Sequence, residues 1–267
     1  MTGSEPLLAV RELRKSFPVA TSALGLAGRR ATAVDGVSFE LARGETLGIV
    51  GESGCGKTTL ARMLMHLVEP DSGEMRFEGR DWGMAKGGEL RGLRRRIQMV
   101  FQDPVASLNP RMRVGPIIGE PLAIHEPGLR RSERVARVAE ALRSVGLDED
   151  AMGRFPHEFS GGQRQRIGIA RALVLRPELV IADEPVSALD VSVGAQILEL
   201  LEKMQSELKL TYILISHSLP VVAQLATRIA VMKAGQFVEI GAADSVLRKP
   251  SHPYTQALLS VVPQIPA

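Results

Sequence analysis

Apolar residues follow two different spacings along the chain. In four short runs almost every residue is apolar and turn residues lie nearby, which predicts buried strands at 46–50, 97–101, 179–183 and 211–216. Between these runs apolar residues recur every three or four positions, as they do on one face of a helix. The clearest helices are 57–68, which ends before Pro70, and 192–208, whose apolar face carries Val193, Ile197, Leu201, Met204 and Leu208. This alternation of strands and helices is typical of an α/β protein.

Other segments depart from this alternation. Residues 7–13 and 36–41 alternate apolar with polar positions and predict an antiparallel layer, with a surface loop at 18–32 between them. Residues 228–241 predict a hairpin. From 103 to 170 the strand pattern stops and helical spacing takes over, which indicates a helical insertion between two strands of one sheet. We therefore predict a core with its antiparallel layer at 1–102 and 171–245, a helical subdomain at 103–170 and a C-terminal tail at 246–267.

Composition adds few constraints. The 267 residues are 45% hydrophobic and 24% charged with a net charge of +3, as in ordinary globular proteins. The one dense basic run, 91–96, is interpreted as a solvated helix face, so we expect no nucleic-acid partner. The single cysteine, Cys55, excludes an intramolecular disulfide and fits a reducing compartment. No targeting segment and no apolar run of membrane-spanning length is visible, so we expect any membrane association to come through partners.

The segment GESGCGKT (51–58) follows a predicted strand and opens a predicted helix. Its spacing, G-x-x-x-x-G-K-[ST], is that of a loop whose glycines let backbone N–H groups surround a phosphate. Lys57 is expected to reach the β- and γ-phosphates of a nucleoside triphosphate, and the Thr58 hydroxyl to ligate Mg²⁺. A redox role for Cys55 is the less favoured alternative to an unconstrained loop position. The predicted nucleotide contacts are Gly51, Glu52, Ser53, Gly54, Cys55, Gly56, Lys57, Thr58 and Thr59.

Polar side chains end three further strands. Asp183 and Glu184 follow the strand at 179–183, where the aspartate can hold Mg²⁺ and the glutamate can orient and polarise the attacking water. His217 ends another strand and is a candidate donor to the γ-phosphate. Gln102 follows the strand at 97–101 and is a candidate for Mg²⁺ ligation or a contact to the attacking water. Together with Lys57, these residues predict ATP hydrolysis.

With these pieces in order, the chain resembles the ATP-binding subunits of ABC transporters. GESGCGKTT resembles the Walker A motif and LVIADE the Walker B motif; Gln102 stands at the Q-loop position, FSGGQ (159–163) at the signature, SALD (187–190) at the D-loop and His217 at the switch histidine. The resemblance implies a P-loop ABC nucleotide-binding domain: a RecA-like core, an antiparallel β subdomain and an inserted α-helical subdomain. It also implies that Phe17 stacks on adenine. The signature and D-loop would contact ATP on a partner's P-loop through Ser160, Gly161, Gly162, Gln163 and Asp190.

The segments VFQDPVASLNP, DEPVSALD and HPYTQALL are similar to the oligopeptide, dipeptide and nickel importer branch, in which this chain resembles the shorter subunit without a cysteine-cluster extension. The branch implies a second, non-identical ATPase subunit, two transmembrane permeases and an extracytoplasmic solute-binding protein, with the chain peripheral on the cytoplasmic face of the inner membrane. Peptide uptake is the leading function; nickel or another small solute is the alternative. Ser218 departs from the usual aspartate after the switch histidine. Soluble ABC ATPases of DNA repair or translation carry features this sequence lacks, and Glu184 with His217 argues against a non-hydrolytic module.

Overall fold

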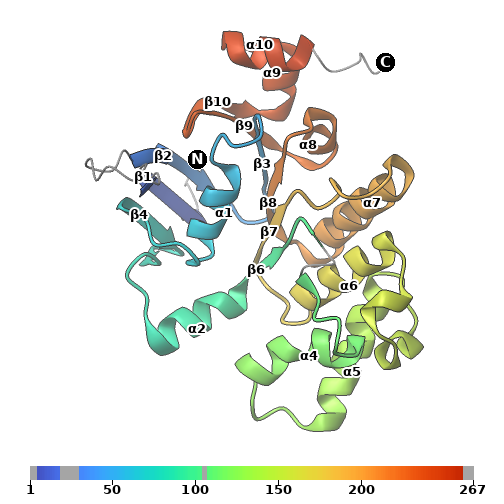
Figure 1. Cartoon of the computed structure of the whole chain (residues 1–267). Helices are drawn as coiled ribbons and strands as arrows, with labels where there is room; N and C mark the ends of the chain where they lie inside the picture. Colours follow the sequence, from blue (N-terminus) through green and yellow to red (C-terminus); the bar gives the residue numbers. More distant parts are fainter. Residues whose placement is uncertain (1–4, 19–29, 104–106, 261–267) are drawn as a thin grey trace, which may run out of the picture. The chain divides into compact units, whose positions relative to one another are not determined.

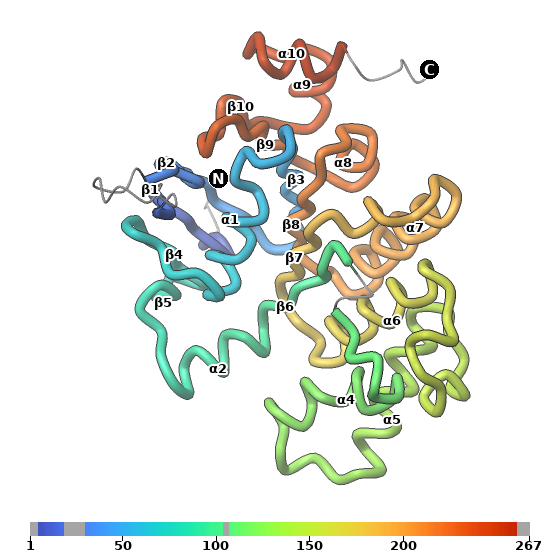
Figure 2. Tube along the Cα trace, viewed as in Figure 1, coloured from blue at the N-terminus to red at the C-terminus, as the bar shows by residue number. Residues whose placement is uncertain are grey.

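The computed structural model describes residues 5–18, 30–103 and 107–260 (Figures 1 and 2). The chain forms two compact units. Unit 1 is Met1–Ala85 with Leu214–Ala267, and unit 2 is Lys86–Ile213. Strand β8 (Thr211–Ser216) crosses the boundary between them along the chain. In the part of the chain that is described, no helix combines the length and the apolarity needed to cross a membrane.

Unit 1 contains an antiparallel sheet in the order β2-β1-β4-β5, which confirms the predicted antiparallel layer. Its strands are β1 (Leu8–Pro18), β2 (Arg30–Leu41), β4 (Ser72–Phe77) and β5 (Arg80–Asp81). The predicted loop at 18–32 is too long, because Pro18 pairs with Arg30 and Phe17 with Ala31. Residues 19–29 of that loop lie outside the described residues.

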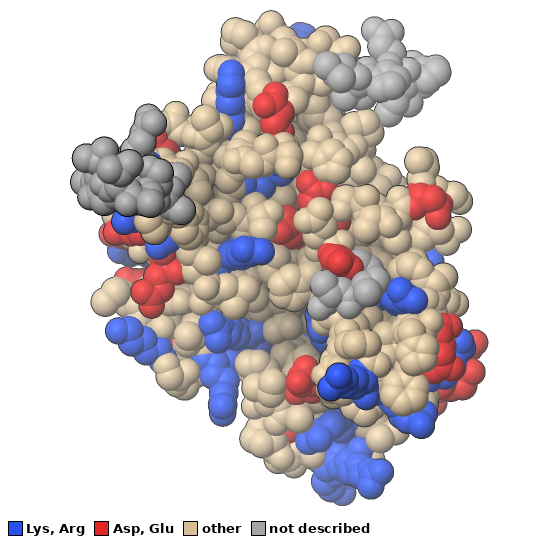
Figure 3. All heavy atoms as spheres, viewed as in Figure 1, with Lys and Arg blue, Asp and Glu red and all other residues tan. Residues whose placement is uncertain are grey.

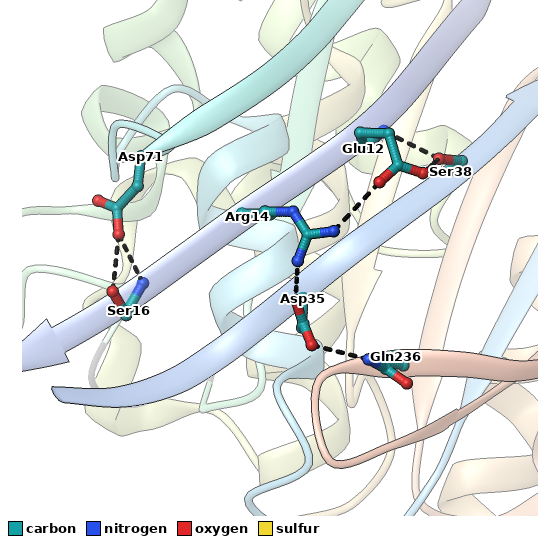
Figure 4. A network of polar contacts seen from close by, with 7 residues as sticks. All are labelled: Glu12, Arg14, Ser16, Asp35, Ser38, Asp71 and Gln236. Carbon is teal, nitrogen blue, oxygen red and sulfur yellow. Dashed lines mark hydrogen bonds and ion pairs between the residues drawn. The ribbon is translucent and has the colours of Figure 1, made fainter.

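A polar network ties this sheet to the hairpin of the same unit (Figure 4). Arg14 on β1 pairs with Asp35 on β2, and the side-chain amide of Gln236 donates to the same aspartate at 2.7 Å. Exposed ion pairs of this kind contribute little stability individually, and these contacts join side chains from three strands of unit 1. The residues drawn in the network are Glu12, Arg14, Ser16, Asp35, Ser38, Asp71 and Gln236.

Unit 1 also holds a second group of strands, with β9 beside parallel β3 and antiparallel β10. The predicted hairpin is β9 (Arg228–Lys233) and β10 (Gln236–Ala242), and β3 (Thr46–Val50) is fully buried, as its apolar sequence requires. The helices are α1 (Lys57–Leu64), α8 (Leu219–Leu225), α9 (Ala243–Arg248) and α10 (Pro253–Ser260).

Helix α1 is shorter than predicted. His66 has a left-handed φ of 53°, and the amides of Leu67 and Val68 both donate to the carbonyl of Arg62. This turn ends the helix before Pro70 acts as a stop. The apolar residues 65–68 therefore follow the helix without belonging to it.

Unit 2 places helices before, between and after two parallel strands, β6 (Ile97–Val100) and β7 (Leu179–Asp183). The helices between them confirm the predicted change of pattern: α4 (Val114–His125), α5 (Arg131–Ser144), the 3-10 turns Glu149–Gly153 and Pro156–Glu158, and α6 (Gly161–Leu173). The flanking helices are α2 (Gly87–Arg96) and α7 (Val191–Leu208).

The basic run at 91–96 lies at the end of α2, and its arginines meet acids of unit 2. Arg95 pairs with Glu126 at 3.0 Å and Arg96 pairs with Glu178. Figure 3 shows Lys and Arg side chains in several groups, interspersed with Asp and Glu, on the face that it draws. The run lies on a helix, as predicted, but two of its arginines are paired with acids, whereas the sequence predicted a solvated face.

Candidate active site

The P-loop, residues 51–56, joins β3 to α1 in unit 1, and two of its backbone carbonyls hold the Lys57 side chain. Lys57 is 6% exposed, and its ammonium group donates to the carbonyls of Gly51 at 2.7 Å and Glu52 at 2.8 Å. The sulfur of Cys55 lies 3.8 Å from the same nitrogen. The lysine charge is thus held inside the loop by neutral acceptors, which leaves it available to an anion.

Two glycines show why the loop needs this residue type. Gly56 has φ 114°, and a Cβ there would lie within 3.0 Å of the Ala33 carbonyl on β2. Gly54 has φ 80°, yet a Cβ there would meet nothing within 4 Å. Gly56 is therefore needed for close packing, while Gly54 faces open space where a phosphate can approach the backbone.

The backbone N–H groups in the first turn of α1 have no acceptor within the helix. Its N-cap is Gly56, no side chain caps it, and no acid lies in its first turn. The backbone N–H groups and the positive end of the helix are therefore directed at whatever the loop binds, an arrangement suited to phosphate. Thr58 and Thr59 lie in this turn, where the sequence predicted them.

His217 lies close to the P-loop within unit 1. A cavity of about 590 Å³ is lined by β3 and P-loop residues, by the segment after β8 and by α10. Its wall includes Gly51, Glu52, His217, Ser218, Tyr254 and Leu258. The fold thus brings the predicted lysine loop and the predicted histidine to one place, although the chain separates them by about 160 residues.

Phe17 lies near the end of β1, 39% exposed, with the Lys15 ammonium 5.7 Å from its ring centroid. The strand end is held by Asp71, whose carboxylate accepts from the Ser16 amide and hydroxyl at 2.8 and 2.9 Å (Figure 4). The same carboxylate accepts from the Lys15 ammonium at 2.9 Å. These bonds, led by the one from Lys15, keep the pKa of Asp71 far below its ordinary value. An exposed ring on a fixed strand end suits stacking on a flat ligand.

Unit 2 gathers the predicted acids at one sheet edge. Because β6 and β7 are parallel and Val100 pairs with Ala182, the segment carrying Gln102 leaves the sheet at the same edge as Asp183 and Glu184. Asp183 is 3% exposed and Glu184 9% exposed. Glu184 also adopts a left-handed φ of 50°, an unfavourable conformation for a non-glycine residue that is often found at functional positions.

The signature segment begins α6, where Ser160 and Gln163 form a capping box. The backbone N–H of Gln163 donates to the Ser160 hydroxyl at 3.3 Å, and the backbone N–H of Ser160 donates to the side-chain oxygen of Gln163 at 3.0 Å. Ser160 and Gly161 are exposed, as a contact to a second molecule requires. Gly162 is buried, and a Cβ there would overlap Val193 on α7. Asp190 similarly caps α7 by accepting from the Val193 amide at 2.9 Å.

The candidate Mg²⁺ ligands offer a hydroxyl from Thr58, an amide oxygen from Gln102 and a carboxylate from Asp183. These are the oxygen donors that Mg²⁺ prefers. Within the described residues no group of three or more His, Cys, Asp or Glu side chains could form a dedicated metal cage. The donor set fits an Mg²⁺ ion held by one carboxylate together with nucleotide phosphates.

Sequence reasoning missed two residues that contact the predicted machinery. Tyr254, on α10, accepts a hydrogen bond from the Glu52 amide in the P-loop at 3.2 Å. Asp71 fixes the strand end beside Phe17. Neither residue belongs to a nucleotide motif, and the contacts join positions 202 and 55 residues apart, so local patterns carry no signal for them.

Comparisons with known proteins agree with this geometry. Residues 34–187 match the ABC transporter family, and residues 238–267 match the oligopeptide/dipeptide transporter C-terminal region. The chain is 52% identical over 260 residues to the oligopeptide transport ATP-binding protein AppF of Bacillus subtilis, covering 97% of this chain and 79% of the relative. It is 52% identical over 232 residues to the oligopeptide transport ATP-binding protein OppF of Streptococcus mutans, covering 87% and 75%. A solved dimeric ATP-binding cassette in a post-hydrolysis state, bound to ADP and Pi, has a TM-score of 0.78 at 28% identity, covering 88% of this chain and 98% of that one.

Proposed function

The chain belongs to the ABC transporter family, and we propose that it is the ATP-hydrolysing subunit of an oligopeptide or dipeptide importer. The observation that carries the proposal is Lys57, held by P-loop carbonyls at the uncapped start of α1, in a loop whose residues Gly51 and Glu52 share a cavity wall with His217. Peptide cargo is supported by the names of the relatives and by the matched C-terminal region.

In unit 1 the P-loop binds the phosphates of ATP. Lys57 keeps its contact with the Gly51 carbonyl and donates a further N–H to the phosphate oxygens, while the N–H groups of the α1 first turn hold the β-phosphate. Phe17 stacks on the adenine ring. His217 is positioned on the same cavity wall as Glu52, where it donates to the γ-phosphate.

In unit 2 Glu184 orients the water that attacks the γ-phosphate and polarises its O–H bond. Its burial and its constrained backbone hold the carboxylate in one direction, which limits the reorganisation needed for reaction. The family resemblance assigns Mg²⁺ to Thr58, Gln102 and Asp183, and the bound ion would neutralise charge developing on the phosphate oxygens.

The signature acts on a second ATPase subunit. The exposed Ser160 and the start of α6 present a hydroxyl and backbone N–H groups with no lysine nearby in sequence, so the lysine for that phosphate comes from the partner's P-loop. The partner is a related, non-identical subunit. Two permeases hold the pair at the cytoplasmic face of the membrane, and a solute-binding protein delivers the cargo.

Nucleotide binding is tested with Lys57→Ala. Titration of the purified full chain with a fluorescent ATP analogue should give saturable binding for the wild type and loss of at least tenfold in affinity for the variant. Lys203→Ala, which removes an exposed lysine on α7, is the matched control and should bind as the wild type does. Equal binding by both variants would refute the P-loop assignment.

Hydrolysis is tested with Glu184→Gln, which keeps the side-chain shape and removes the base. ATP should still bind, while turnover by the assembled ATPase pair falls by about 10²- to 10⁴-fold. Glu202→Gln, at an exposed position of α7, is the control. Normal turnover by Glu184→Gln would place water activation on another residue.

Cargo is tested with the permeases and binding protein reconstituted in vesicles. Transported di- or oligopeptides should stimulate ATP hydrolysis, whereas stimulation by nickel alone would identify the alternative cargo. A chain that never co-fractionates with membranes when the permeases are co-expressed would contradict the transport function.

A further inference from the structure

The C-terminal segment (238–267) matches the oligopeptide/dipeptide transporter C-terminal region, yet none of the ATP-binding roles proposed for unit 1 falls on it. In the structure its last helix, α10, contacts the P-loop. The Glu52 amide donates to the Tyr254 hydroxyl at 3.2 Å, and the Lys233 ammonium lies 4.6 Å from the Tyr254 ring centroid. Tyr254 is half-buried, so its hydroxyl lies at the cavity wall, not in bulk solvent.

The contact falls on one particular peptide group. The amide of Glu52 and the carbonyl of Gly51 belong to the same planar trans unit, so they point in opposite directions. The carbonyl accepts from the Lys57 ammonium at 2.7 Å, and the amide donates to Tyr254. Tyr254 and Lys57 therefore hold this peptide from its two sides, and the hydroxyl fixes the direction of the carbonyl that presents the lysine.

The residues before Tyr254 hold it in place. The Glu239 carboxylate on β10 accepts from the Ser251 amide at 2.8 Å, from the Ser251 hydroxyl at 2.9 Å and from the His252 amide at 3.1 Å. The His252 ring nitrogen Nδ1 then accepts from the Tyr254 amide at 3.1 Å. Pro253 begins α10, where its missing N–H costs nothing. His252 and Pro253 thus fix the backbone at Tyr254 and with it the position of the tyrosine side chain.

We propose that Tyr254 is a positioning residue for ATP binding, which holds the Gly51–Glu52 peptide in the orientation that presents Lys57 to phosphate. The inference rests on the proposed ATP-binding function and gives the C-terminal segment a part in it. ATP affinity then depends on the docking of α10 on the P-loop.

The decisive variant is Tyr254→Phe, which keeps the ring over Lys233 and removes only the hydroxyl. Loss of one hydrogen bond of this kind should raise the Kd for ATP about 2- to 10-fold. The Kd for inorganic tripolyphosphate should rise by the same factor, because the effect acts through the phosphate loop and not through the base. The melting temperature should stay within about 2 °C of the wild type, since the loss of one half-buried hydroxyl contact changes global stability little.

The matched control is Tyr212→Phe, since the chain has two tyrosines. The Tyr212 hydroxyl is buried and makes no hydrogen bond within the described residues, so its removal should leave both Kd values unchanged. Wild-type affinity for both ligands in Tyr254→Phe would overturn the inference. So would a fall in melting temperature as large as that of Tyr254→Ala, because it would make the hydroxyl a general stabiliser of α10.

The Lys57→Ala variant separates this failure from failure of the proposed function. If Lys57→Ala abolishes binding while Tyr254→Phe binds normally, the positioning role alone is wrong. If Lys57→Ala binds ATP as the wild type does, the proposed nucleotide site itself is wrong.

Discussion

Replacing Gly162 with alanine tests whether the signature segment depends on its packing against α7. Gly162 is the second residue of α6 and is buried, and a Cβ built on it would come closer than 3.0 Å to the Val193 side chain. Valine in a helix has one strongly preferred χ1 rotamer, so Val193 cannot easily turn its methyl group away. The strain must therefore be relieved by separating α6 from α7.

Two effects of opposite sign decide the magnitude. Alanine favours a helix over glycine by about 0.8–1.0 kcal/mol in the interior, and by less at this first-turn position. Overpacking a well-filled contact costs about 1–3 kcal/mol. The clash is the larger of the two, so Gly162→Ala should lower the free energy of unfolding by about 0.5–2 kcal/mol.

A double-mutant cycle isolates the clash. Val193→Ala removes the overlapping methyl groups, so alanine at 162 should be neutral or stabilising by up to about 1 kcal/mol in that background. Urea unfolding of the four chains, followed by circular dichroism, measures the coupling, which should be about 0.5–3 kcal/mol. ATP turnover by the assembled pair should fall in Gly162→Ala and recover in part in the double variant. Additive effects on stability would refute the packing argument.

Three further predictions concern unit 1. Burial raises the pKa of Glu239, but hydrogen bonds led by that from the Ser251 amide outweigh it and bring the folded pKa to about 2 from an ordinary 4.5. The stabilising contribution of the Glu239 carboxylate is therefore complete above about pH 4.5 and is lost as the pH falls toward 2. The difference in melting temperature between the wild type and Glu239→Gln should shrink across that window. A constant difference would contradict this prediction. Phe17→Ala should raise the Kd for ATP at least about fivefold through lost stacking, with tripolyphosphate binding unchanged; equal losses for both ligands would rule out a base contact. Trp82 is fully buried and donates to the Leu64 carbonyl at 3.0 Å, so Trp82→Phe should lower the free energy of unfolding by about 2 kcal/mol or more in urea titrations, and an unchanged midpoint would show that the carbonyl finds another donor.

The elements that carry chemistry could be predicted because their signals are local. The apolar runs before the P-loop and before Asp183 form β3 and β7 within the predicted bounds. A strand that is buried on both faces must be apolar along its whole length. A loop whose backbone N–H groups bind phosphate must be rich in glycine, so both features can be recognised in a short stretch of sequence. The helix after Asp190 was predictable for the same reason, since its apolar residues repeat at helical spacing.

Local signals failed where pairing or turns decide the boundary. β1 extends to Pro18 and β2 begins at Arg30, although Ser16 and the first residues of β2, Arg30 to Ala33, are polar or small. Several register shifts between these strands blur the alternation on which the prediction depended. The end of α1 was missed because a left-handed residue, His66, ends a helix whose apolar spacing continues.

The sequence by itself determined which residues we propose for phosphate, metal and water, because each follows a strand or begins a helix that its own neighbours specify. Only the tertiary structure decided what holds those residues in place. Tyr254 accepts a hydrogen bond from Glu52, the Ala33 carbonyl packs against Gly56, and the Val193 side chain fills the space beside Gly162. Such contacts depend on how distant segments pack, and packing is a property of shape and distance in three dimensions that no local spacing records.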